Sequence, residues 1–258
     1  MRCIHLFEIE DQSWLPNVFR NILTDFLKHL NMTFGFYTAA IPLIERVLAQ
    51  IRSKHIIDLC SGASGPWVKL TKEMDIFVTL TDKYPNLEAF QQIVAQSDGK
   101  IGFIEESVDA TDVPSHLDGM RTIFSGFHHF RPDVAKAILY DAARKRKAIG
   151  IFEFTERNLR TVLTTPILFP LLIIVLTPFI RPVTFSRFFW TYIIPIALII
   201  PTFDGVVSHL RSYSPEELKE MVSSIASERY KWEIGQVATG VNRRLKLPIT
   251  YLIGYPID

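Results

Sequence analysis

Short apolar runs and amphipathic stretches alternate from residue 55 to residue 154, and this alternation constrains the fold more than any other feature of the chain. It predicts, in order, strand 55–60, helix 66–74, strand 76–82, helix 86–97, strand 101–105, strand 121–126, helix 132–146 and strand 148–154. Regular alternation of this kind is typical of a parallel sheet with right-handed crossovers. We therefore expect an α/β fold with helices on both faces of the sheet.

A further helix and two strands are predicted near the end of the chain. Ser214-Pro-Glu-Glu217 provides an N-cap serine, a proline at the first helical position and acids in the first turn, which predicts a helix over 215–227. Strands over 230–237 and 249–254 follow. We expect the basic loop 242–246 to connect them as a hairpin.

The first predicted strand ends in an acid and a turn of small residues, Asp58-Leu-Cys-Ser-Gly-Ala-Ser-Gly65. Gly62 and Gly65 allow the backbone to turn tightly and to approach a bound group without a side-chain clash. Turns of this kind after a buried parallel strand recur at nucleotide-binding sites. The residues of the turn that we expect to contact a ligand are Asp58, Cys60, Ser61, Gly62, Ala63 and Gly65.

Two more acids follow the second and third predicted strands. Asp82 is placed to accept hydrogen bonds from the two ribose hydroxyls of an adenosine, and we expect the adjacent Lys83 to contact the same ligand. Asp109 is placed to reach the adenine amino group, while Ala110 leaves room for the ring. Each acid alone is equally compatible with a helix N-terminus or a plain turn. Their common order along the chain favours an adenosine-containing cofactor.

The fourth predicted strand leads into Phe124-Ser-Gly-Phe-His-His-Phe-Arg131. Ligands in open α/β sheets bind beyond the carboxyl ends of the strands, so Ser125, His128 and His129 are expected to face the site. A histidine there can accept a proton from a substrate O–H or N–H group, because its ordinary pKa lies near neutrality. Adjacent histidines point in different directions in most backbones, so we expect at most one to be the base. The alternative is that both cap the next helix or pack against the cofactor.

Glu153 ends the fifth predicted strand and completes the candidate catalytic set. We expect it to hold the substrate or to orient a histidine, and the alternative is an ion pair with Arg157 or Arg131. The candidate catalytic residues are therefore His128, His129 and Glu153.

We expect no metal site, because no third ligand stands at a recognisable spacing from the two histidines.

These motifs together resemble class I S-adenosylmethionine-dependent methyltransferases over roughly 50–160 and 205–258. The family's usual Asp-x-Gly-x-Gly-x-Gly reads here as Asp58-x-Cys60-x-Gly62-x-Ser64, which keeps small residues in the turn. The resemblance implies a Rossmann-like, seven-stranded, mostly parallel sheet with the last strand antiparallel. It also implies S-adenosylmethionine as cofactor, with its methionine part over residues 58–65, its ribose at Asp82 and its adenine at Asp109.

A charge-free apolar stretch follows the fifth predicted strand. Residues 161–180 and 188–203 contain no charged residue, and only the first run reaches the roughly 20 residues that span a bilayer. Prolines interrupt both runs, and a full hairpin would leave Arg181 and Arg187 outside, against the positive-inside tendency. We therefore predict a shallow hairpin in the membrane interface with its arginines facing anionic lipid. A buried helical pair or a dimer interface is the alternative.

The apolar stretch divides the chain into three predicted parts. Helical spacing of apolar residues predicts an N-terminal helical cap over 1–50, followed by a cofactor-binding domain over 51–160 and 204–258 with a hydrophobic hairpin insertion over 161–203. The insertion leaves the sheet from the carboxyl end of a strand, where substrate pockets lie. We expect Phe34, Tyr37 and the N-terminal helices to form the other wall of this pocket. We therefore expect a small, lipophilic acceptor, methylated at the membrane surface.

Composition excludes several other classes of function. A net charge of +1 provides no broad basic field, which argues against nucleic acid as the main partner. Cys3 and Cys60 lie far apart and resemble reduced cytosolic cysteines. The first residues, through Asp11, contain no uninterrupted apolar core, so we expect no signal peptide. A cytoplasmic, membrane-associated protein is expected, and its oligomeric state stays open.

Two other functions compete with methyl transfer. A short-chain nicotinamide-dependent reductase has a similar glycine turn, but it requires a Tyr-x-x-x-Lys pair, and no tyrosine in this chain is followed by a lysine at the fourth place. The second is a non-catalytic, methyltransferase-like protein that anchors a partner at the membrane. The irregular glycine turn and the absence of an unambiguous catalytic base keep this second function open.

Overall fold

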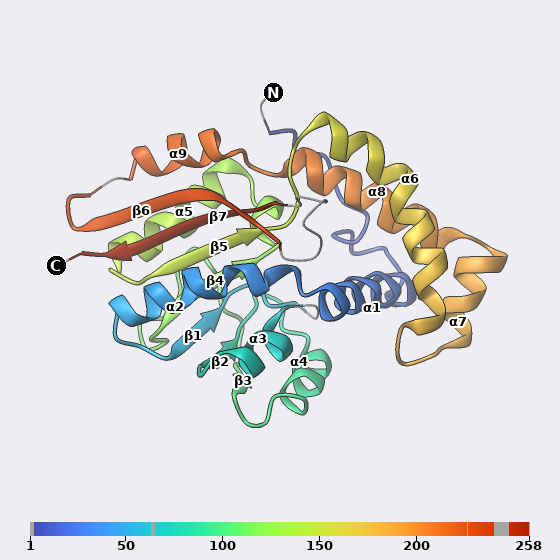
Figure 1. Ribbon diagram of the computed structural model, residues 1–258, viewed down its shortest axis with the longest axis horizontal. Coiled ribbons are helices and arrows are strands. Elements are labelled where there is room, and N and C mark those ends of the chain that lie inside the picture. Colours follow the sequence, from blue (N-terminus) through green and yellow to red (C-terminus); the bar gives the residue numbers. More distant parts are fainter. Residues whose placement is uncertain (1–2, 63–64, 226, 240–247, 258) are drawn as a thin grey trace. The chain divides into compact units, whose positions relative to one another are not determined.

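The computed structural model describes residues 3–62, 65–225, 227–239 and 248–257. The chain divides into two compact units (Figure 1). Unit 1 consists of residues 1–34 and 155–213, and unit 2 consists of residues 35–154 and 214–258.

Unit 2 contains a seven-stranded sheet with the strand order β3-β2-β1-β4-β5-β7-β6. The strands are β1 (His55–Asp58), β2 (Phe77–Leu80), β3 (Ile101–Phe103), β4 (Met120–Phe124), β5 (Ile149–Glu153), β6 (Tyr230–Ala238) and β7 (Pro248–Pro256). Strands β1 to β5 pair in parallel, whereas β7 pairs antiparallel with both β5 and β6. The predicted Rossmann-like fold with an antiparallel last strand is confirmed. The predicted hairpin loop 242–246 lies outside the described residues.

Helices cover both faces of this sheet. They are η1 (Phe36–Ala40), α2 (Ile41–Gln50), α3 (Trp67–Glu73), α4 (Leu87–Val94), η2 (Phe127–His129), α5 (Pro132–Arg144) and α9 (Pro215–Ser223). One face packs on η1, α2, α3 and α4 through buried side chains that include Ile44, Leu70 and Phe90. Alternate strand residues such as Ile57 and Ile123 are buried on the opposite face, where α5 and α9 lie (Figure 1).

The start of α9 follows from its sequence. Ser214 Oγ accepts a hydrogen bond from the Glu217 N–H, and the Glu217 carboxylate accepts one from the Ser214 N–H. This reciprocal capping box satisfies two backbone donors that a helix N-terminus leaves without partners. The helix ends at Ser223, earlier than the predicted residue 227.

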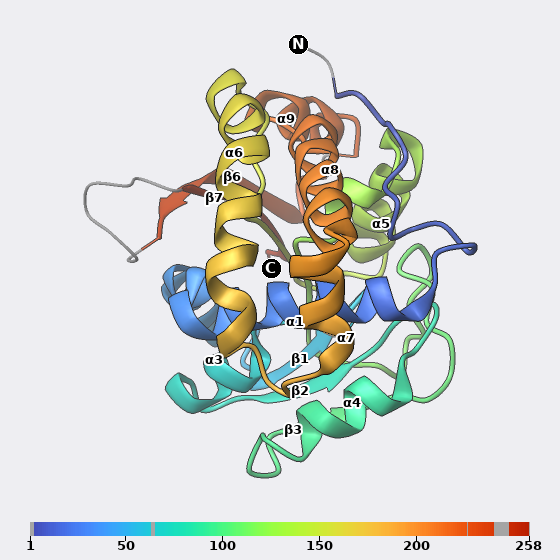
Figure 2. The same ribbon diagram turned by 90° about the vertical axis from the view of Figure 1, so that its right-hand side faces the viewer.

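Unit 1 is helical. It contains α1 (Asn17–Phe34), α6 (Leu159–Leu176), η3 (Thr177–Phe179), α7 (Phe185–Phe188), η4 (Phe189–Ile193) and α8 (Ile196–Arg211). Figure 2 shows α6 and α8 side by side with α1 crossing behind them. Phe26 of α1 packs edge-on against Phe169 of α6, with 5.5 Å between ring centroids. Arg187 of α7 is buried, forms an ion pair with Asp25 of α1 and donates to the Pro182 carbonyl oxygen at 2.7 Å.

Residues 3–13 of unit 1 are attached to α8 by charged groups. The Asp204 carboxylate accepts hydrogen bonds from the backbone N–H groups of Ile9 at 2.6 Å and Glu10 at 3.0 Å. Arg211 forms ion pairs with Glu8 and Asp11, both at 3.0 Å. Because Glu8 and Asp204 are almost fully buried, these contacts supply the partners that buried charges require.

One stretch of unit 1 has the length and composition of a membrane-spanning helix. Among the described residues, Leu159–Phe179 passes this test by itself, although only 17% of its most apolar window is buried. The segments Phe185–Ile193 and Ile196–Arg211 pass it only together, and they are bent by 80° at the break between them. Such a bend is expected where prolines interrupt a helix.

The limits of the two units differ from the predicted three-part division. Tyr37, Ala40 and Ile44 are buried in the core of the sheet, so residues 35–50 belong to unit 2 rather than to a separate cap. Helix α1 contacts α8 and belongs with the apolar hairpin. Residues 155–213 of unit 1 include the predicted insertion 161–203, and α8 continues beyond it as one helix to Arg211.

A substitution at Gly119, which precedes β4, tests how closely β4 packs against β1. Its φ is +146°, and a Cβ atom there would lie 2.6 Å from the carbonyl oxygen of His55. We expect Gly119→Ala to lower the free energy of unfolding by about 2–4 kcal/mol, because the clash is with main chain that cannot move aside. Urea denaturation followed by circular dichroism measures the loss.

Gly102 of β3 provides the matched control. Within the part of the chain that the structure describes, and apart from the residues on either side, no atom lies within 4 Å of the position that its Cβ would occupy. Gly102→Ala should therefore change the free energy of unfolding by less than about 1 kcal/mol. Equal losses in the two variants would contradict this account of β4.

Candidate cofactor-binding and catalytic site

The sequence-predicted site residues of unit 2 follow the carboxyl ends of parallel strands. Asp58 ends β1, Asp82 follows β2, Ser125 follows β4 and Glu153 ends β5. Asp109 joins them because the neighbouring Val108 N–H donates to the Asp82 carbonyl oxygen at 2.9 Å. The parallel pairing brings these ends to one edge of the sheet, where ligands of open α/β sheets bind.

Asp58 is buried at the end of β1 and connects three elements. Thr122 of β4 donates its hydroxyl to Asp58 Oδ1 at 2.7 Å. The Asp58 carbonyl oxygen accepts hydrogen bonds at 2.9 Å from the Ser61 hydroxyl and from both the N–H and the hydroxyl of Thr81. Burial raises the pKa of the Asp58 carboxyl to about 6, although the hydrogen bonds from Thr122 and Ser61 oppose this shift.

The turn after β1 adopts a left-handed backbone at two positions. Cys60 has φ +57° and Gly62 has φ +51°. A non-glycine residue in this region is strained, and the strain explains why glycine is usual at the position of Cys60 in the family that this turn resembles. Gly65 closes the turn, with its Cβ position 4.0 Å from Asp58 Oδ2. Ala63, also predicted to contact the cofactor, lies outside the described residues.

The Cys60 thiol is a poor nucleophile in this setting. Burial, followed by the charges of Asp82, Asp58 and Asp109, raises the pKa of the thiol well above its ordinary value. The thiolate is the reactive form of cysteine, so Cys60 stays in its inert, protonated form.

Asp82 links the turn after β1 to the end of β2. Its Oδ2 accepts a hydrogen bond from the Gly62 N–H at 3.1 Å, and its Oδ1 accepts one from the Tyr84 N–H at 2.9 Å. Each carboxylate oxygen has two lone pairs, so both can accept a further hydrogen bond from a ligand hydroxyl. The geometry is compatible with the predicted ribose contact.

Asp109 and Lys83, predicted as separate cofactor contacts, form an ion pair with each other. Lys83 Nζ lies 2.7 Å from Asp109 Oδ2, and Thr111 donates its N–H and its hydroxyl to Asp109 Oδ1 at 2.9 and 2.7 Å. Hydrogen bonds from Lys83 and Thr111 lower the pKa of the Asp109 carboxyl to about 2. Oδ1 already accepts two hydrogen bonds, so an adenine amino group would have to approach Oδ2 beside Lys83. The adjacent Ala110 is buried.

Ser125 follows β4 in a left-handed conformation, with φ +44°. Its hydroxyl makes a short hydrogen bond with the phenol of Tyr37, which comes from η1 and is buried. Burial raises the pKa of the Tyr37 phenol, so the phenol keeps its proton. Tyr37 was predicted only to form part of a wall of the site. Its bond to Ser125 joins positions far apart in the sequence, and no spacing rule reveals it.

Glu153 and His128 form a buried pair beyond β4 and β5. Glu153 Oε2 lies 2.7 Å from His128 Nδ1, and Oε1 accepts a hydrogen bond from the Phe127 N–H at 2.6 Å. Burial alone would raise the pKa of the Glu153 carboxyl, but His128 and the Phe127 N–H hold it below its ordinary value. A carboxylate beside Nδ1 favours the tautomer that carries its proton there, which makes Nε2 the basic nitrogen. Of the predicted alternatives for Glu153, this geometry corresponds to orienting a histidine.

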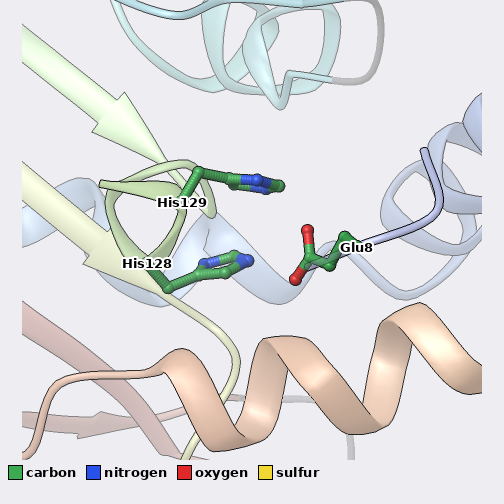
Figure 3. Close-up of side chains that lie close together, drawn as sticks. All are labelled: Glu8, His128 and His129. Carbon is green, nitrogen blue, oxygen red and sulfur yellow. The ribbon is translucent and has the colours of Figure 1, made fainter. Parts of the chain in front are cut away.

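His129 lies beside His128 rather than pointing away from it. The two ring centroids are 4.4 Å apart and the rings are inclined by 33°. Figure 3 shows both imidazoles extending from the η2 turn in a similar direction. The expectation that adjacent histidines diverge was wrong here, because the short η2 helix places consecutive side chains closer together than an extended backbone does.

Comparison with known proteins identifies similar folds but no similar sequence. No family model matches this sequence, and no curated protein matches it. Several solved structures superimpose with a TM-score of 0.50. The methyltransferase domain of bacterial CtHen1-CN is 14% identical, with 85% of this chain and 99% of that chain covered. PigF with SAH is 16% identical, with 95% and 62% covered. The mitomycin 7-O-methyltransferase MmcR is 13% identical, with 88% and 54% covered.

The chain therefore spans the whole of the first of these structures but less than two thirds of the other two. At this level of identity the similarity concerns the fold of the chain and not its substrate.

The buried Asp58 carboxyl predicts a characteristic pH dependence. Between its ordinary pKa of 3.8 and about 6, the folded state holds a proton on Asp58 that the unfolded state has lost, so this group's contribution to stability falls as the pH rises. Asp58→Asn removes this loss and keeps an acceptor for Thr122. From pH 4 to pH 7, we expect the free energy of unfolding of Asp58→Asn to rise by about 1–3 kcal/mol relative to the wild type. Chemical denaturation across this pH range measures it, and parallel profiles would contradict it.

Proposed function

We propose that this chain, which has the fold of class I S-adenosylmethionine-dependent methyltransferases, binds S-adenosylmethionine and transfers its methyl group to a small, lipophilic acceptor at a membrane surface. The observation that carries the proposal is the convergence of Asp58, Gly62 and Asp82 at the carboxyl ends of β1 and β2. The cofactor, when bound, supplies a methyl group on a positively charged sulfur.

The residues at this edge of the sheet fit that cofactor. Asp82 has acceptor capacity for the ribose hydroxyls. Beyond its chain neighbours, no atom of the described residues lies within 4 Å of the Cβ position of Gly62, so these residues leave open space beside its backbone. The carboxylates of Asp58 and Asp82 also provide negative charge for a cationic ligand. Cys60, Ser61 and Gly65 complete the turn, and Ser125 directly follows β4, which pairs with β1.

We assign the role of general base to His128. Glu153 fixes the ring through Nδ1, and Nε2 is then the nitrogen that accepts a proton from an O–H or N–H group of the acceptor. The His129 ring lies beside the His128 ring, with 4.4 Å between their centroids. Much of the rate of methyl transfer comes from in-line positioning, so the base assists the reaction rather than carrying it.

The apolar surface of α6 supports an acceptor of lipophilic character. The side chains of this helix that are more than half exposed include Leu159, Leu163, Ile167, Leu168, Leu171 and Val175. A continuous apolar surface of this kind marks a site of contact with a membrane or with an apolar partner. The chain passes from Glu153 to the first residue of α6 within six residues, so this surface begins close in sequence to the catalytic carboxylate.

The bend of 80° within the second apolar segment favours a hairpin that lies in the membrane interface rather than one that crosses the bilayer. We expect the protein to lie on the cytoplasmic face. Exposed arginines, among them Arg160 and Arg181, would then contact anionic headgroups.

Cofactor binding is tested by titration calorimetry with S-adenosylmethionine and S-adenosylhomocysteine. Asp82→Asn removes the charge of the ribose acceptor and should weaken binding about 10-fold or more, because hydrogen bonds to charged groups contribute about 1.5–3 kcal/mol. The exposed Asp133→Asn variant in α5 should bind as the wild type does. Absence of binding by the folded wild type would support the non-catalytic alternative, a methyltransferase-like protein that only attaches to membranes.

Membrane contact is tested by flotation with phosphatidylcholine–phosphatidylglycerol vesicles. The double variant Leu163→Glu/Ile167→Glu should reduce the partition coefficient at least about 10-fold, because each replaced side chain loses about 1.5–3 kcal/mol of burial in the lipid. Tyr140→Glu, which changes an exposed aromatic residue of α5, should have no effect. If both variants floated to the same extent, the exposed side chains of α6 would not be the membrane contact.

A further inference from the structure

Two hydroxyl groups meet at the edge of the sheet that carries the candidate site. Tyr37 of η1 and Ser125, which directly follows β4, share a hydrogen bond between their side-chain oxygens. The backbone N–H of Phe154, which directly follows β5, donates to the same Ser125 oxygen at 3.4 Å. All three residues belong to unit 2. Ser125 Oγ therefore joins η1 to the ends of β4 and β5.

One proton of this pair has no acceptor among the described residues. Tyr37 and Ser125 each carry one O–H proton, but a single hydrogen bond joins their oxygens, and the Phe154 N–H is a third donor. Burial raises the pKa of the Tyr37 phenol, so the phenol keeps its proton, and a phenol is a better donor than an aliphatic hydroxyl. Tyr37 and Phe154 thus both donate to Ser125 Oγ. The proton that remains is that of Ser125.

The backbone of Ser125 holds this hydroxyl in place. Its φ of +44° lies in the left-handed region, which is strained for a residue other than glycine. Its N–H donates to the Phe152 carbonyl oxygen at 2.9 Å, and its hydroxyl is fixed by Tyr37 and Phe154. The Tyr37 ring packs edge-on against Phe124, with 5.0 Å between ring centroids. Strain of this kind persists where surrounding contacts over-determine it, and it is concentrated at functional sites.

Ser125 lies beside the turn that follows β1. The chain continues from β1 to β2 on one side and from β4 to β5 on the other, so the paired strands β1 and β4 form the topological switch point of the sheet (Figure 1). A Cβ atom on Gly126 would lie 3.8 Å from the Cβ of Cys60, which places the segment 125–126 directly beside the turn. Ser125 is partly exposed, so a ligand at the turn can reach its hydroxyl.

The remaining proton selects one chemical group of the cofactor. The methionine part of S-adenosylmethionine carries an ammonium, a sulfonium and a carboxylate. The carboxylates of Asp58 and Asp82 accept hydrogen bonds and suit the two cations, but they repel the carboxylate. Among the hydroxyl and ammonium donors of the predicted cofactor contacts, Ser61 donates to the Asp58 carbonyl oxygen at 2.9 Å and Lys83 forms an ion pair. The Ser125 hydroxyl is the donor that remains for the carboxylate.

We propose that the Ser125 hydroxyl, oriented by Tyr37, donates a hydrogen bond to the carboxylate of the cofactor's methionine part. Ser125 contacts the ligand, and Tyr37 is a positioning residue that acts through Ser125. The hydrogen bonds that Ser125 Oγ accepts from Tyr37 and Phe154 polarise its own O–H group and make it a stronger donor. This inference rests on the proposed cofactor binding and adds the group of the cofactor that is recognised at this point.

Titration calorimetry with S-adenosylhomocysteine and with its decarboxylated analogue tests the assignment. The analogue keeps the adenosine, the sulfur and the amino group and lacks only the carboxylate. The wild type should bind S-adenosylhomocysteine at least about 5-fold more tightly than the analogue, because hydrogen bonds to charged groups are the stronger ones. Ser125→Ala should weaken S-adenosylhomocysteine binding at least about 5-fold and analogue binding less than about 2-fold.

Tyr37→Phe separates a positioning role from a structural one. It keeps the ring and removes the phenol, so it should weaken S-adenosylhomocysteine binding at least about 3-fold and leave analogue binding unchanged. The double variant Tyr37→Phe/Ser125→Ala should bind S-adenosylhomocysteine as Ser125→Ala does, because Tyr37 acts through Ser125. Two matched changes of exposed residues, Tyr140→Phe in α5 and Ser223→Ala in α9, should leave the binding of both ligands unchanged.

Ser125→Gly removes the same hydroxyl and adopts the left-handed backbone without strain, so it keeps the test available where alanine prevents folding. It should reproduce the selective loss of S-adenosylhomocysteine binding. Equal weakening of both ligands in the Ser125 variants, or unchanged binding of both, would overturn the carboxylate contact and leave the proposed cofactor binding in place. Absence of binding of either ligand by the folded wild type would overturn both.

Discussion

The end of β1 is held from three directions, and the candidate site depends on this arrangement. The Asp58 carbonyl oxygen accepts hydrogen bonds from Ser61 in the turn and from Thr81 at the end of β2, while the Asp58 side chain accepts one from Thr122 of β4. These bonds fix the register of the three central strands at the point where the chain turns. They also place a carboxyl group in a buried position, which is tolerated because its hydrogen bonds offset part of the cost of desolvation.

Much of the fold could be predicted because its causes are local. Alternation of strands and helices predicted the parallel sheet, and the cap at Ser214 predicted the start of α9. The limits of the units could not be predicted in the same way. Both α1 and α2 have an apolar face, and nothing in their spacing reveals that α2 packs on the sheet while α1 contacts α8.

The candidate site was predictable in residue type but not in pairing. Acids at strand ends were identified from their positions, yet the ion pair between Lys83 and Asp109 and the bond between Tyr37 and Ser125 join residues that are far apart in sequence. Long-range pairs depend on side-chain direction, which a one-dimensional pattern does not contain. The left-handed backbone at Cys60 was visible only as a departure from glycine.

The points at which the chain leaves and re-enters unit 2 have an evolutionary consequence. It leaves after Phe154, just beyond β5, and returns at Ser214, the N-cap of α9. All seven strands lie in unit 2, so insertions, deletions or substitutions in 155–213 leave the hydrogen-bonded ladder of the sheet intact. Selection can therefore diversify the apolar segment while the sheet, and the cofactor-binding edge that it carries, stays unchanged.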